Sequence, residues 1–268
     1  KREGRHVLDS HVGEGERGNS VADHFYRALV LPLVEFVGRM GWSLVLILAL
    51  VLTYRITDSI WGTFAYPFYL GELQYTNDEV AFASKFFGVG AIVLGLALGG
   101  WLITVLGRMF TLTLGAVLSA ATNLLYADLA IGGGTMAAVS NAIGFTWAVE
   151  QFGGTAKLAR LMITIGGENL AIGIAGAAYI AWLSSIVAKG YSAVQYALLA
   201  SLTLLVGTLG RGALGQMIER QGYYDVFIFV TLIGVVAVVL CLAEWWRESR
   251  QGRSSGVVAP DPAVLPAE

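Results

Sequence analysis

The chain alternates long apolar runs with short polar connections. Six of these runs reach the length of about 17 to 25 residues that a transmembrane helix needs, and they cover residues 42–66, 80–106, 109–130, 161–187, 193–215 and 224–246. Composition agrees with this pattern, because 56% of the residues are hydrophobic, only 13% are charged and the mean hydropathy is +0.67. The sequence predicts an all-α integral membrane protein whose residues 42–246 form a bundle of six transmembrane helices.

The segments around these runs are more polar. Residues 1–41 are mixed, and within them 23–41 interleave apolar and charged side chains, so we expect a cytoplasmic leader that ends in an interfacial helix. Residues 131–160 are too interrupted to span a bilayer, which predicts a re-entrant or interfacial segment on the outer side. Three prolines in 247–268 predict a disordered cytoplasmic tail. Because the chain begins at Lys1 without a methionine or a signal peptide, we expect a fragment or a processed start.

Positive charges predict the orientation of the bundle. If the N-terminal side is cytoplasmic, seven cations fall inside, namely Arg27, Arg39, Arg108, Lys189, Arg247, Arg250 and Arg253. Only Lys157, Arg160 and Arg220 fall outside. Cytoplasmic loops carry an excess of Lys and Arg, so both ends of this chain should be cytoplasmic. The net charge of −2 and the lack of a dense basic tract argue against nucleic acid as a partner.

Small residues recur where helices could approach one another. Gly95 and Gly99 are four residues apart in the second run, and Gly173 and Gly176 lie in the fourth. Such spacing lets two membrane helices pack with their backbones close together. We expect these glycines to serve packing.

Polar residues are shared unevenly among the six runs. The first, second, fourth and fifth runs hold nearly all the strongly polar positions, which are Arg55, Asp58, Lys85, Glu168, Asn169, Gln195 and Arg211. Ionisable side chains at membrane depth are costly and usually mark a pathway or a polar contact. We therefore expect these four helices to line a polar cavity for the solute and the third and sixth to face lipid. The alternative is pairing that only holds the bundle in register, between Arg55 and Asp58 or between Lys85 and Glu168.

Asp58 is the first candidate for proton coupling. A carboxylate leaving water is driven towards its neutral form, whereas a nearby cation favours the ionised form. Asp58, with Arg55 three residues before it, could therefore bind a proton in one state and pair in the other.

Enzyme, metal and cofactor motifs are missing from the sequence. It contains no phosphate-binding GxxxxGK[ST], no HExxH and no CxxC. The three histidines are all among the first 24 residues, and the single cysteine, Cys241, lies in an apolar run. We expect no enzymatic activity, no bound metal and no cofactor.

Two sets of residues resemble a known family. Gly100, Gly107 and Arg108 resemble the short cytoplasmic G-x-x-x-D-R-x-G-R motif of the major facilitator superfamily, although Thr104 and Val105 replace its acidic and first basic positions. A longer series resembles AmpG-type muropeptide permeases of that superfamily: Tyr54 to Asp58 (YRITD), Pro67 to Tyr69 (PFY), Ser84 to Gly88 (SKFFG), Gly99-Gly100, Glu168-Asn169, Ala177 to Tyr179 (AAY), Leu183 to Ser185 (LSS) and Tyr191 to Ser201 (YSAVQYALLAS). Arg55, Val194 and Ala200 depart from the family pattern of lysine, threonine and serine.

The resemblance implies the C-terminal half of a twelve-helix major facilitator fold, with an N-terminal six-helix half missing. It also implies a symporter in the bacterial inner membrane that imports anhydromuropeptides, an amino-sugar disaccharide with a short peptide, together with protons. In facilitator halves the first, second, fourth and fifth helices line the cavity, which are the same four in which the charges occur. Two alternatives remain. One is a facilitator for another large solute, such as a sugar conjugate or an acetyl-carrier thioester, and the other is a half-bundle membrane module that does not transport.

Overall fold

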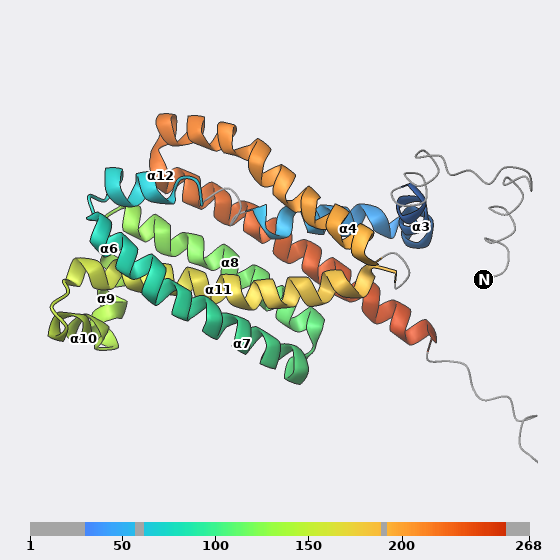
Figure 1. Ribbon diagram of the computed structural model, residues 1–268, viewed down its shortest axis with the longest axis horizontal. Helices are drawn as coiled ribbons and strands as arrows, with labels where there is room; N and C mark the ends of the chain where they lie inside the picture. Colours follow the sequence, from blue (N-terminus) through green and yellow to red (C-terminus); the bar gives the residue numbers. More distant parts are fainter. Residues whose placement is uncertain (1–29, 57–61, 189–191, 256–268) are drawn as a thin grey trace, which may run out of the picture.

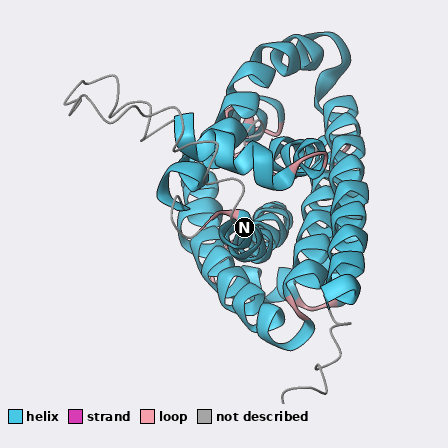
Figure 2. Ribbon diagram, turned by 90° about the vertical axis from the view of Figure 1, so that its right-hand side faces the viewer, coloured by secondary structure: helices cyan, strands magenta, loops and turns pink. Residues whose placement is uncertain are grey.

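All regular elements in the described part of the chain are helices. The computed structural model describes residues 30–56, 62–188 and 192–255. Figure 1 shows the long helices lying side by side, and Figure 2, turned by 90°, shows helices joined by short loops. In chain order the elements are α3 (Leu31–Met40), α4 (Ser43–Tyr54), η2 (Pro67–Glu72), α6 (Asn77–Ala81), η3 (Phe82–Phe87), α7 (Gly88–Leu106), α8 (Arg108–Ala130), α9 (Gly134–Ala142), α10 (Phe145–Gln151), α11 (Ala156–Ile186) and α12 (Ser192–Ser255), where η2 and η3 are π-helical.

The predicted multi-span helical membrane protein is confirmed. Within the described ranges, four helices are long and apolar enough to cross a membrane, Asn77–Leu106, Arg108–Ala130, Ala156–Ile186 and Ala193–Arg250. A fifth span is possible if α3 and α4, which meet at 111°, are counted together. The longest of the four, α12, has a break at Gly222, where φ is +83° and the chain turns back in Figure 1. The two limbs of α12 cover the predicted runs 193–215 and 224–246.

The first predicted span differs from the structure. We predicted one helix over 42–66, and this is wrong, because α4 ends at Tyr54 and a separate π-helical segment begins at Pro67. Pro67 lies in the first turn of this second segment, a position where proline is favoured because its missing amide hydrogen would have no partner there. Residues 57–61, which include Asp58, lie outside the described residues.

The C-terminal end of the bundle is also more helical than predicted. We expected a disordered tail from residue 247, but α12 continues to Ser255. Arg247 forms an ion pair with Glu244 of the preceding turn at 2.6 Å, and the Arg250 guanidinium lies 3.5 Å from the centre of the Trp246 ring. Both contacts join residues three or four apart and therefore favour the helix. Residues 256–268 lie outside the described residues.

Helix α11 is the centre of the bundle and packs tightly on α7. A side-chain carbon placed on Gly95 would lie 2.3 Å from the carbonyl oxygen of Leu170, and one on Gly173 would lie 2.5 Å from that of Ile92. The two backbones thus approach too closely for any residue except glycine. The packing role predicted for these glycines is confirmed.

Two clusters of buried side chains lie along α11. One contains Tyr179 and the fully buried Trp182, together with residues of α4, α8 and α12. The other contains Leu161 and Ile165, together with the aromatic rings of η2 and α8. Glu168 follows the second cluster on α11, so a carboxylate is held at the border of a tightly packed region.

Between α8 and α11 the chain forms two short helices. They are α9, with nine residues, and α10, with seven. The Asp128 carboxylate, near the end of α8, accepts hydrogen bonds from the first amides of α9, those of Thr135 and Met136. Each helix is much shorter than the roughly 20 residues that a membrane span requires.

Candidate functional site

A pocket lined by both apolar and polar side chains lies beside α11 near the end of the bundle that carries α6. Its volume is about 210 Å³, and its polar lining consists of Tyr66, Tyr69, Ser84, Lys85, Glu168 and Asn169. Three of the predicted cavity residues, Lys85, Glu168 and Asn169, therefore meet in one pocket. They come from two elements that are about 80 positions apart in the sequence.

Both π-helical segments contribute to this pocket. Tyr69 comes from η2, whereas Ser84 and Lys85 come from η3. A capping box starts α6, the short helix that leads into η3: the Thr76 hydroxyl accepts from the Glu79 amide, and the Glu79 carboxylate accepts from the Thr76 amide. A π-helical turn inserts an extra residue and so changes the face on which later side chains lie, and such turns are frequent at functional sites.

Tyr69 at the pocket wall and Tyr126 behind it are both buried, and their hydroxyls form a chain that ends on Glu168. The Tyr69 and Tyr126 hydroxyls are 2.9 Å apart, and the Tyr126 hydroxyl donates to the Glu168 carboxylate. Tyr126 is 1% exposed and Tyr69 is 5% exposed, so water does not compete for these hydrogen bonds. The carboxylate is therefore held from the protein side while it borders the pocket.

Sequence reasoning missed Tyr126. It lies on α8, the third predicted span, which we expected to face lipid, yet α8 buries eleven of its residues. A tyrosine inside an apolar run was the available signal, because a buried hydroxyl needs a hydrogen-bonding partner. A single sequence does not say which partner that is.

Asn169 is fixed by its own helix and by α7. Its amide nitrogen donates to the Ile165 carbonyl at 2.8 Å, and a side-chain carbon on Gly88 would lie 3.1 Å from that nitrogen. Gly88 therefore makes room for the Asn169 side chain at the pocket wall.

A loop near the pocket is joined to the start of α11. The Tyr75 hydroxyl donates to the Lys157 carbonyl at 3.0 Å, and the Lys157 ammonium donates to the Gln74 carbonyl and lies 4.4 Å from the centre of the Tyr75 ring. Burial raises the pKa of Tyr75 to about 12, an effect that nearby Arg160 opposes. The Tyr75 hydroxyl thus stays protonated and remains a donor at neutral pH.

The other predicted cavity residues do not line this pocket. Gln195 is 2% exposed and lies at the opposite end, where its amide nitrogen donates to the Pro32 carbonyl and to Glu35 of α3. These bonds attach α3 to the bundle and give Gln195 a structural role. Arg211 is exposed on α12. Arg55 follows the last turn of α4, and a side-chain carbon on Gly176 would lie 3.5 Å from its guanidinium.

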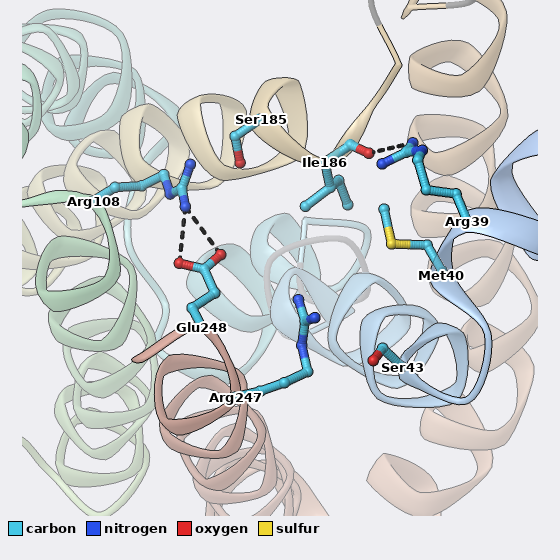
Figure 3. A pocket seen from close by; sticks show the side chains of 8 residues that line it. All are labelled: Arg39, Met40, Ser43, Arg108, Ser185, Ile186, Arg247 and Glu248. Atoms are coloured by element: carbon cyan, nitrogen blue, oxygen red, sulfur yellow. Dashed lines mark hydrogen bonds and ion pairs between the residues drawn. The ribbon is translucent and has the colours of Figure 1, made fainter. Parts of the chain in front are cut away.

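The residues of the loop motif lie between α7 and α8. Gly107 has φ of +88°, which favours glycine and lets one helix end and the next begin within a single residue. Arg108 donates two hydrogen bonds of 2.9 Å to Glu248 of α12, as Figure 3 shows. Gly100 has nothing within 4 Å of the position of a side-chain carbon.

In the described ranges no group of three His, Cys, Asp or Glu side chains could hold a metal ion.

Known proteins similar to this chain are transporters. No protein-family model matches the chain. It is 26% identical to "Putative transporter AmpG 1" of Rickettsia prowazekii over 203 residues, which are 76% of this chain and 41% of that protein. It is also 26% identical to "Putative transporter AmpG 4" of Rickettsia felis, over 80% of this chain and 46% of the relative. The anhydromuropeptide permease of Escherichia coli K12 is 26% identical over 81% of this chain and 39% of the relative.

These likenesses confirm the resemblance to AmpG-type permeases. The relatives are named as transporters or permeases, which are not enzymes. The chain spans less than half the length of each of these three relatives.

Proposed function

We propose that this chain forms the second half of a proton-coupled permease that imports anhydromuropeptides across the bacterial inner membrane for cell-wall recycling. The observation that carries the proposal is the pocket in which Lys85, Glu168 and Asn169 meet, in a chain similar to an anhydromuropeptide permease. An ammonium, a carboxylate and an amide suit a solute that presents peptide carboxylates, sugar hydroxyls and amides.

The size of the pocket supports a binding site that this chain forms together with a second helical half. Small-molecule sites usually have volumes of about 300 to 1,000 Å³, whereas this pocket has about 210 Å³. It would therefore hold one part of the solute, and a further six-helix half would supply the rest. The length of the relatives that this chain does not cover is consistent with such a half.

The exposed surface of α7 supports the same arrangement. Only 11% of the most apolar part of the Asn77–Leu106 span is buried, and Phe86, Val93 and Trp101 are each at least 59% exposed. An apolar helix with so little cover needs lipid or another helical unit around it. We assign this surface to the lipid bilayer and the missing N-terminal half.

Labelling of single cysteines tests the orientation, in which both ends are cytoplasmic. Cysteines at Asn77 and Gln221, both exposed, should react with an impermeant thiol reagent added outside intact cells, whereas a cysteine at exposed Ser249 should react only after the cells are opened. Gln221 is preferred to Gly222, whose φ of +83° disfavours a side chain. Native Cys241 is fully buried and should give little background. If only the cysteine at Ser249 reacted from outside intact cells, the orientation would be the opposite of the one proposed.

Proton coupling is tested at Asp58. In vesicles containing the complete transporter, Asp58→Asn should abolish uphill uptake of labelled anhydromuropeptide driven by a proton gradient, because the amide cannot bind a proton and release it. Exchange of labelled for unlabelled solute should persist, since exchange needs no net proton movement. Wild-type uptake must stop when an uncoupler is added. If Asp58→Asn still concentrates the solute in an uncoupler-sensitive manner, the proton is carried elsewhere, and Glu168 is the next candidate. If the wild type neither imports nor exchanges this solute, the proposed substrate is wrong.

A further inference from the structure

Lys85 lines the pocket beside α11 without a partner in the described part of the chain. Its polar neighbours in the pocket are engaged by the protein. The Ser84 hydroxyl donates to the Val80 carbonyl at 2.6 Å, and the Glu168 carboxylate accepts from Tyr126. The Lys85 ammonium, in contrast, makes no hydrogen bond or ion pair with any described residue. Its three N–H donors are therefore available to a group that this part of the chain does not supply.

A structural ion pair does not explain Lys85. The sequence left open that Lys85 and Glu168 pair only to hold the helices in register. Both residues are described and line the same pocket, yet no ion pair joins them. Glu168 is held instead by the Tyr126 hydroxyl, on the protein side of the pocket. The cation and the anion thus share one pocket without neutralising each other directly.

The position of Lys85 in the membrane limits what its ammonium can face. Lys85 lies inside the apolar span Asn77–Leu106, and its side chain is exposed on the surface of this chain. An ammonium in hydrocarbon is unfavourable, so charged residues within membrane spans face a water-filled cavity or a polar partner and avoid the lipid tails. The exposed side of Lys85 therefore indicates the side on which the pocket opens to the transport cavity.

We propose that Lys85 binds a carboxylate of the solute, so that this pocket holds the peptide part of an anhydromuropeptide and not its sugars; the assignment rests on the proposed function. The free carboxylates of such a solute belong to its peptide, whereas the two sugars present hydroxyls and amides. A hydrogen bond between an ammonium and a carboxylate is about twice as strong as one between neutral groups. The unpaired cation of the pocket therefore favours the charged part of the solute.

Asn169 and the size of the pocket suit the same assignment. The Asn169 amide nitrogen donates to the Ile165 carbonyl at 2.8 Å, and its side-chain carbonyl oxygen can then accept from a peptide N–H. With a volume of about 210 Å³, the pocket has room for part of the solute and not for a disaccharide together with a peptide. A cation and an amide in a small pocket thus match the end of a short peptide.

Uptake of two forms of one solute tests the assignment in vesicles that contain the complete transporter. One form is labelled anhydromuropeptide with free carboxylates, and the other is the same compound with every carboxylate converted to an amide. The wild type should show a KM about tenfold lower for the free form, because loss of one partner from an enclosed charged contact costs at least that factor. Lys85→Met should raise the KM of the free form to that of the amidated form and leave the amidated form unchanged. Lys85→Arg, which keeps the charge, should keep most of the preference.

Two controls separate recognition of the carboxylate from general effects. Lys85→Met removes a charge that has no partner among the described residues, so the Tm of the purified variant should stay within about 2 °C of the wild type. Arg220→Gln removes another exposed cation, just before the turn of α12 at Gly222 and outside the pocket. It should change the KM of neither form, which excludes a long-range effect of net charge.

The outcomes distinguish this assignment from the proposed function. Equal uptake of both forms by the wild type would overturn the assignment and leave the proposed function standing. An equal rise in KM for both forms in Lys85→Met would also overturn it, because Lys85 would then serve the structure or pair with a carboxylate of the missing half. If the wild type takes up neither form, the proposed substrate is wrong, and the assignment falls with it.

Discussion

Uptake of labelled anhydromuropeptide by the complete transporter should fall at least about thirtyfold when Glu168 is replaced by glutamine. Loss of one partner from a desolvated charged contact costs about 2 kcal/mol or more, which corresponds to that factor. Glutamine has the size of glutamate and can still accept a hydrogen bond from Tyr126, so the change removes the charge and little else. The amount of protein in the membrane should stay near that of the wild type. Normal uptake by Glu168→Gln would assign the residue to helix packing.

Tyr126→Phe tests whether the hydroxyl chain behind the pocket holds Glu168 in position. This change deletes one oxygen from a side chain that is 1% exposed, and it should raise the apparent KM about tenfold with little effect on the maximal rate, because a hydrogen bond to a charged group contributes about 1.5 kcal/mol or more. The matched control is Tyr54→Phe, since the Tyr54 hydroxyl is also buried but donates to the Leu112 carbonyl. If both variants change KM equally, the effect reflects stability and not positioning.

The sequence predicted well whatever depends on hydrophobicity and residue size. Apolar runs of bilayer length correspond to helices because lipid offers no hydrogen bonds to an exposed backbone. Gly95 and Gly173 were recognisable as contact positions because glycine is common where membrane helices touch. Positive φ at Gly107 and Gly222 likewise explains why glycine stands at these two turns between long helices.

The parts that depend on local breaks and long-range pairing could not be read in the same way. An apolar run gives no sign of where a helix will stop, so the predicted span over 42–66 missed the end of α4 at Tyr54 and the π-helical turn at Pro67. Gln195 has the composition of a cavity residue, yet its partner is Pro32, which precedes it by 163 positions. A hydropathy scale scores each residue without regard to its contacts. It therefore cannot distinguish a buried polar residue that joins two helices from one that lines a transport site.

The candidate site illustrates the same limit. Lys85, Glu168 and Asn169 stood out because each interrupts an apolar run, and the structure brings them to one pocket. Tyr126 did not stand out, although it contacts the central carboxylate of that pocket. Arginines at the other end were counted as topogenic charges, and only the structure shows that three of them line one pocket.

Replacing Gly95 with leucine should prevent the bundle from forming. Even the first side-chain carbon would lie 2.3 Å from the Leu170 carbonyl oxygen and 3.1 Å from the Gly173 backbone, and neither atom can rotate away. Relief requires α7 and α11 to separate, although these two helices form the closest contact in the bundle. The cost should exceed about 3 kcal/mol, at the upper end of the usual cost of overpacking.

The measurement is the fraction of detergent-extracted protein that elutes as a single folded species, together with its Tm. Gly90→Leu is the matched control, because Gly90 is five residues earlier on the same helix and has nothing within 4 Å of a side-chain carbon. Leucine there faces lipid or an added helical unit and should leave the folded fraction near that of the wild type. Gly173→Leu should reproduce the defect of Gly95→Leu, since its side-chain carbon would lie 2.5 Å from the Ile92 carbonyl oxygen. If Gly95→Leu folds as well as Gly90→Leu, α7 and α11 do not cross at these glycines, and the pocket formed by η3 and α11 must be assembled in another way.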